Sequence, residues 1–257
     1  PAKIGCVEIG TLGITAGAQL FSAQAIAFWD ALLDKGAKVA PLGGSDDHRA
    51  GTQTGLFPAK IGSPTTLVRA TELSTQGILD GIRKGATVVK LDGPDDAMVE
   101  LEAAPLRGGG DAIAFPGDTI GVRSIVLRAI VTKGVGQTVR FVKNGHAEES
   151  VPVTSDPFVH ERLVDAPAEG EERWRAEWLV DERPRTVTGH VWLRFDANGP
   201  EVPAPSSAED GCGISRRGRP LAPPAIAVAA MALALFRSLR RRRGGDARSG
   251  RADPGSM

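Results

Sequence analysis

A carboxylate and an imidazole stand two residues apart in the segment GGSDDH, residues 43–48. The segment follows the apolar run 38–42, which predicts a strand, so Asp46 and His48 can turn towards the same open edge of a sheet. Oxygen and nitrogen ligands together suit Zn²⁺, Mn²⁺ or Fe²⁺ better than Ca²⁺ or Mg²⁺. The two glycines allow the tight backbone bend that converging ligands require. We therefore predict Asp46 and His48 as metal ligands; an ion pair in an exposed loop is the alternative.

Two further side chains could act at the same edge. Glu8 lies near the end of the apolar run 4–9, which predicts a buried strand, and its carboxylate could point to the same rim. The alternative is a buried carboxylate that supports a ligand from behind. Arg49 follows His48 directly and could contact an anionic substrate; a solvated loop arginine is the alternative.

Strands and helices alternate in residues 1–96. Ser22 can cap a helix that runs to about Asp34, and Ser74 can cap a second helix that ends at Gly85. The apolar run 87–91 then returns as a strand. This alternation predicts an α/β layer architecture for the first part of the chain.

The periodicity changes to two in residues 97–197. Several short alternating runs are separated by turn residues, and Asn144-Gly145 between two such runs predicts a tight hairpin. We predict an antiparallel β-sandwich, with Trp174, Trp178 and Trp192 in its core. Carbohydrate binding by these tryptophans is the alternative.

The end of the chain has the composition of a membrane anchor. Residues 198–220 form a Pro- and Ser-rich linker, and residues 221–239 begin with 16 residues that carry no charged or polar side chain. We predict a transmembrane helix there and an Arg-rich tail at 240–257 that stays on the cytoplasmic side. A buried Ala-rich helix is the alternative.

The order of segments in residues 4–92 resembles the C-terminal part of the polymerase-and-histidinol-phosphatase (PHP) metallohydrolases, and most closely their carbaryl-hydrolase-like branch. The motif GGSDDH carries the resemblance, together with the helical segment 25–36 before it and the segment 61–68 after it. In that family the motif supplies the last metal ligands of a distorted β/α barrel. The resemblance therefore implies that Asp46 and His48 bind a divalent metal (Zn, Mn or Fe), with two or more ions in the intact protein.

The histidine content departs from that family. Its first ligands come from a His-x-His motif, whereas the four histidines here are His48, His146, His160 and His190, and none forms that motif. A catalytic metal normally has three protein ligands and a water. We therefore expect this chain to be the C-terminal portion of a longer protein, and to be inactive alone.

Residues 210–243 resemble the myxobacterial C-terminal sorting signal known as MYXO-CTERM. The likeness rests on Gly211-Cys212-Gly213, an apolar segment and an arginine cluster. It implies a sorting protease that acts near Cys212, and a membrane-anchored protein displayed outside the cytoplasm or on the cell surface.

Composition limits the remaining function classes. The formal net charge of the 257 residues is zero, and no basic patch with interleaved aromatic residues is present, so we expect no nucleic-acid partner. The expected function is metal-dependent hydrolysis of a small phosphoester, ester or carbamate. The alternative is a non-enzymatic surface protein with a degenerate barrel, which binds through its β-sandwich.

Overall fold

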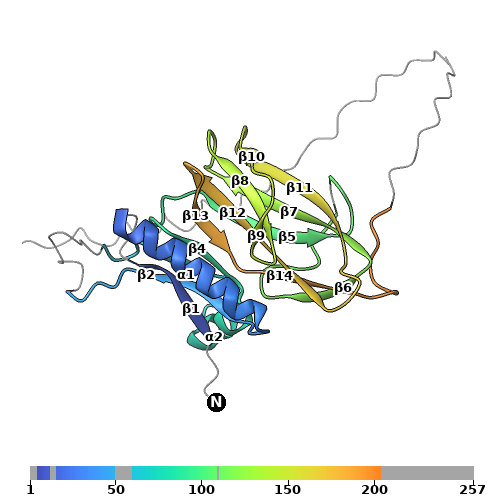
Figure 1. Ribbon diagram of the computed structural model, residues 1–257, viewed down its shortest axis with the longest axis horizontal. Helices are drawn as coiled ribbons and strands as arrows, with labels where there is room; N and C mark the ends of the chain where they lie inside the picture. The colour runs from blue at the N-terminus through green and yellow to red at the C-terminus, as the bar shows by residue number, and fades with distance from the viewer. Residues whose placement is uncertain (1–4, 12–15, 50–59, 109, 204–257) are drawn as a thin grey trace, which may run out of the picture. The chain divides into compact units, whose positions relative to one another are not determined.

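The structure is a computed structural model that describes residues 5–11, 16–49, 60–108 and 110–203 (Figure 1). These residues belong to one compact unit, Pro1–Ser206, while the second unit, Ser207–Met257, lies outside the described residues. The helices are α1 (Ala16–Asp34) and α2 (Thr75–Lys84). The strands are β1 (Cys6–Thr11), β2 (Ala40–Gly44), β3 (Thr65–Val68), β4 (Thr87–Lys90), β5 (Met98–Ala104), β6 (Thr119–Val122), β7 (Ser124–Thr132), β8 (Thr138–Lys143), β9 (His146–Ala147), β10 (Val151–Pro152), β11 (Phe158–Asp165), β12 (Glu171–Val180), β13 (Arg183–Thr188) and β14 (Val191–Phe195).

Strands β1 and β2 form a parallel pair, and helix α1 connects them. Trp29 of α1 is fully buried, and its Nε1 donates a hydrogen bond to the carbonyl oxygen of Val39, 2.9 Å away. Ile9 of β1 and Val89 of β4 belong to the same apolar cluster as Trp29. This cluster fixes α1 and β1 against the larger sheet, so the ends of β1 and β2 are held at a defined place.

Two mostly antiparallel layers form the remainder of the described unit, in which β6 pairs in parallel with β14. A nine-stranded sheet has the order β10-β8-β12-β13-β4-β3, with β14, β6 and β9 off this path, and a three-stranded sheet has the order β11-β7-β5. Apolar side chains from both sheets meet in one core, which includes Leu101, Leu127, Phe141, Trp174 and Trp178. Strands before and after residue 96 share the nine-stranded sheet, because β13 pairs with β4.

The fold-class prediction of an α/β chain with part of a β/α barrel is wrong. The described ranges contain two helices and mostly antiparallel strands, and β3 pairs antiparallel with β4. The reason lies in α2: Val68 at the end of β3 pairs with Thr87 at the start of β4, so α2 connects neighbouring strand ends. A barrel unit would need a helix that returns along the strands to start the next one in parallel.

The same prediction placed a transmembrane helix at 221–239, a segment outside the described residues. Of the helices that the structure does describe, neither is long and apolar enough to cross a membrane. The prediction that combined a PHP barrel with a membrane helix is therefore corrected: the described residues form a β-rich unit.

Local signals in the sequence place several elements correctly. Ser74 caps α2 by accepting a hydrogen bond from the amide of Gly77 at 3.0 Å, and Gly85 ends the helix with φ 83°. Asn144 and Gly145 form the tight turn between β8 and β9 with φ values of 49° and 81°. Helix α1 begins at Ala16 instead of Ser22, because the apolar helical pattern continues towards the N-terminus.

Replacing Gly81 by alanine should destabilise the protein, although alanine is the better helix former. A β-carbon at Gly81 would lie 2.6 Å from Val68 Cγ1 and 2.8 Å from the carbonyl oxygen of Arg69. The carbonyl oxygen of Arg69 belongs to the backbone and cannot rotate away as a side chain could, so the clash requires a shift of the helix. We expect a loss of about 1–3 kcal/mol in the free energy of unfolding, measured by urea denaturation. Gln76→Ala on the exposed face of α2 is the control, and its free energy of unfolding should be close to that of the parent. A Gly81→Ala variant as stable as the parent would contradict this packing.

Candidate functional site

Asp46 and His48 lie together just beyond the end of β2. His48 Nε2 is 2.8 Å from Asp46 Oδ1, and Asp46 has a left-handed backbone conformation with φ 52°. Gly43 is required here by packing, since a β-carbon would lie 2.8 Å from both Pro64 Cβ and Val89 Cγ1. At Gly43 the backbone passes close to Pro64 and Val89, and at Asp46 it bends. Together these features turn the side chains of Asp46 and His48 towards each other.

Glu8 lies on the neighbouring strand and faces the same place. It is opposite Leu42 in the β1–β2 register, and it accepts hydrogen bonds from the backbone of Gly44 and the hydroxyl of Thr11. Burial raises the pKa of Glu8, and the negative charge of Asp46 raises it further. The ends of β1 and β2 therefore bring two carboxylates and one imidazole to a common rim, which we call the β1–β2 rim (Glu8, Asp46 and His48).

The rim is open to solvent at its outer side. The side chains of His48 and Asp46 are 80% and 55% exposed. Arg49, also exposed, donates its backbone N–H to Asp47 Oδ1 at 2.7 Å, so the Asp47 side chain closes the turn at residues 47–49. Such a rim is accessible to a small molecule, and an exposed polar contact of this kind contributes little to folding.

The donor atoms of the rim suit a borderline divalent cation but do not complete its coordination. Asp46 and His48 offer one oxygen and one nitrogen at a separation that two ligands of one ion can adopt after a small rotation. Within the described ranges, no three His, Cys, Asp or Glu side chains are grouped closely enough to hold a metal ion. At least one further ligand would have to come from elsewhere. The role of Asp46 and His48 as ligands stays a prediction.

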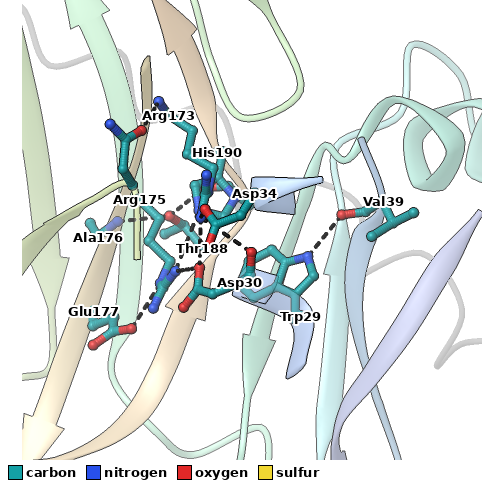
Figure 2. Close-up of polar contacts among 12 residues, drawn as sticks. Trp29, Asp30, Asp34, Val39, Arg173, Arg175, Ala176, Glu177, Thr188 and His190 are labelled. Atoms are coloured by element: carbon teal, nitrogen blue, oxygen red, sulfur yellow. Dashed lines mark hydrogen bonds and ion pairs between the residues drawn. The ribbon is translucent and has the colours of Figure 1, made fainter. Parts of the chain in front are cut away.

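A second cluster of charged residues lies between α1 and β12 (Figure 2). Arg175 donates from Nη1 to Asp30 Oδ1 at 2.7 Å and from Nε to Glu177 Oε1 at 2.8 Å. Glu177 accepts two more hydrogen bonds at its Oε2, from Arg140 Nε and Nη2 at 2.9 and 2.8 Å. Arg173 binds Asp34 at 2.6 Å. We call this set the buried ion network (Asp30, Asp34, Arg140, Arg173, Arg175 and Glu177), although the Asp34 side chain at its margin is 60% exposed; its pairs join β12 to α1 and to β8, and one pair, Arg175–Glu177, lies within β12.

His190 completes the network from the segment between β13 and β14. Its ring packs against Trp29 and Trp192 with centroid distances of 4.7 and 6.0 Å, and its Nε2 lies 3.4 Å from Arg175 Nη1. Burial, followed by the positive charges of Arg175 and Arg173, holds the pKa of His190 well below its usual value. The imidazole is therefore neutral at pH 7. Its burial and its neighbours make it a structural residue that joins α1 to the sheet.

Sequence patterns alone did not identify this network. Residues 173–180 alternate, and Trp174 and Trp178 enter the sandwich core as predicted. The opposite face carries Arg173, Arg175 and Glu177, which α1 covers, and three charges on one strand face are normally solvated. The signal that could have located it is the pair Asp30 and Asp34, one helical turn apart on α1. Trp192 differs from the prediction, because it packs beside His190 against the apolar cluster that contains Trp29.

No family model, curated protein or solved structure matches this chain. The predicted sorting motif Gly211-Cys212-Gly213 lies outside the described residues. Processing at Cys212 and display on the cell surface therefore stay predictions, as does the PHP resemblance. The chemistry of the β1–β2 rim is the basis on which function can be argued.

Proposed function

We propose that the protein is a metal-dependent hydrolase and that Asp46 and His48 supply two ligands of one divalent cation. The observation that carries the proposal is the approach of His48 Nε2 to Asp46 Oδ1, 2.8 Å, at the open ends of two parallel strands. A cation in that position would lower the pKa of a bound water and polarise a phosphoryl or carbonyl oxygen. Zn²⁺, Mn²⁺ and Fe²⁺ fit this mixed oxygen and nitrogen donor set.

The residues around these two ligands have defined parts in the proposal. Glu8 lies behind them, held by the backbone of Gly44, and its negative charge adds to the attraction of the rim for a cation. Arg49 follows His48 on the exposed side, where an anionic phosphoester would approach. The substrate class is a small phosphoester, ester or carbamate, and a cation with three protein ligands would need at least one donor beyond Asp46 and His48.

Metal binding at the rim can be tested without any assay of activity. Titration of the isotopically labelled chain with Mn²⁺ should broaden the amide signals of residues 44–48 first, because paramagnetic broadening falls steeply with distance. His48→Gln and Asp46→Asn should each remove this selective broadening. His146→Gln is the matched control, since His146 is exposed at the start of β9, and it should leave the effect unchanged. Equal broadening of the rim signals in parent and His48→Gln proteins would exclude the site.

Hydrolysis is tested on two proteins. One is the 257-residue chain, and the other is the product that also includes any coding sequence preceding Pro1. We expect no appreciable turnover of aryl phosphates, esters or carbamates by the 257-residue chain alone, because its described residues lack a complete ligand set. In the longer product, Asp46→Asn or His48→Gln should reduce metal-dependent turnover at least about 100-fold, as loss of a ligand interaction does. Unchanged turnover in both variants would overturn the proposed function.

A binding role is the second candidate, and one observation favours it. The two sheets leave a cavity of about 310 Å³ between them, which is within the size range of small-molecule sites. This cavity shares no residue with the β1–β2 rim, so the two candidates can be tested separately.

A further inference from the structure

The two sheets differ in width, and the difference leaves part of the larger sheet uncovered. Strand β5 is the edge of the three-stranded sheet, whereas β3 and β4 are the last strands of the nine-stranded sheet. A cavity of about 310 Å³ opens between these two edges, with walls from β3, β4, β5 and the segment at Phe115-Pro116. We call it the sheet-edge pocket.

The interior of the sheet-edge pocket is apolar. Leu67 and Val88 are directly opposite each other in the β3–β4 register, so their side chains share one face of the sheet. Met98 and the buried Leu101 of β5 line the opposite wall. An unbranched methionine in such a wall adapts its shape to different apolar ligands.

A cation without an ion-pair partner stands at this pocket. Arg69 follows β3, is exposed, and its guanidinium carbon lies 3.3 Å from the centre of the Phe115 ring. Among the residues that the structure describes, no carboxylate is within ion-pair distance of Arg69. By contrast, Arg128 near the same edge is held by Glu102 and Glu161 at 2.9 and 3.0 Å. The N–H groups of Arg69 are therefore available to a ligand, and stacking on the Phe115 ring orients the guanidinium plane.

We propose that the sheet-edge pocket binds an amphipathic monocarboxylate, with the apolar chain against Leu67, Val88 and Met98 and the carboxylate on Arg69. The planar guanidinium suits a carboxylate because two parallel N–H groups can bind its two oxygens. Glu100, an exposed acid that also lines the pocket, disfavours ligands with a second negative charge. This inference does not depend on metal binding or hydrolysis.

Isothermal titration with two probes of equal chain length separates the charge from the apolar contact. Octanoate should bind to the chain, and octanol should bind about five-fold more weakly because it has no charge to pair with Arg69. Arg69→Gln should weaken octanoate binding about five-fold, as expected for one exposed ion pair, and leave octanol binding unchanged. Arg83→Gln is the matched control: Arg83 is an exposed arginine of α2 that pairs with Asp80, and its loss should not affect either probe.

A second variant tests the location of the apolar chain. Met98→Trp should fill the cavity and abolish binding of both octanoate and octanol, with the unfolding transition measured to confirm that the variant is folded. If that variant does not fold, loss of octanol binding in Leu67→Gln gives the same information. Three results would each overturn the proposal: no octanoate binding, equal affinity for octanoate and octanol, or octanoate affinity that Arg69→Gln leaves unchanged.

Discussion

Replacing Glu177 by leucine should lower the free energy of unfolding by about 3–5 kcal/mol, the largest stability effect that we expect for a single substitution in this protein. The side chain of Glu177 is 1% exposed and pairs with both Arg175 and Arg140. Leucine would remove the shared carboxylate from Arg175, whose side chain is only 3% exposed, and from Arg140, whose side chain is 20% exposed. Burial opposes the charged form of Glu177, but the two arginines outweigh it and hold its pKa below its usual value.

The measurement is equilibrium denaturation by urea, with the slope of the transition compared between variants. Arg123→Ala is the matched control, because Arg123 pairs with Glu201 at the surface, where both side chains are about half exposed. Its loss should cost less than about 1 kcal/mol. A cost of the same small size for Glu177→Leu would show that the buried ion network is solvated in solution.

Acidification should destabilise the protein through His190, beginning below about pH 6.5. The pKa of His190 is depressed in the folded state, whereas an unfolded histidine titrates near ~6.5. Between these two values the unfolded chain binds a proton that the folded chain does not, so the free energy of unfolding falls as the pH falls. One such group contributes about 1.4 kcal/mol per pH unit in this window, and at pH 7 and above the group has no effect.

The test compares the free energy of unfolding of the parent and of His190→Gln from pH 7.5 to pH 5. Glutamine cannot be protonated, so the variant should take up about one proton fewer on unfolding in this pH range. Its free energy of unfolding should therefore change less steeply with pH than that of the parent. His160 is half-buried, and burial followed by the charge of Arg162 also lowers its pKa, but it is present in both proteins and cancels in the comparison. Identical slopes in the parent and His190→Gln would show that the imidazole reaches solvent.

The sequence determined those features that depend on a few neighbouring residues. The serine cap and the left-handed glycine at the two ends of α2 are local hydrogen-bonding and backbone requirements, so residue type alone predicts them. The same holds for Asn144-Gly145, whose two positive φ values demand these residue types. The spacing of Asp46 and His48 also singled out a pair that the fold brings to 2.8 Å, because two residues on one strand end can approach without any distant contact.

Tertiary structure alone decided how these pieces are assembled. The helix between β3 and β4 suggested a parallel barrel unit, yet the pairing of β4 with β13, nearly one hundred residues later, makes both strands part of an antiparallel sheet. Likewise, α1 covers Arg175 and Glu177 on β12, a face whose charges alone suggest exposure to solvent. Strand pairing and burial are set by the free energy of contacts between distant segments, which no local pattern of residues specifies.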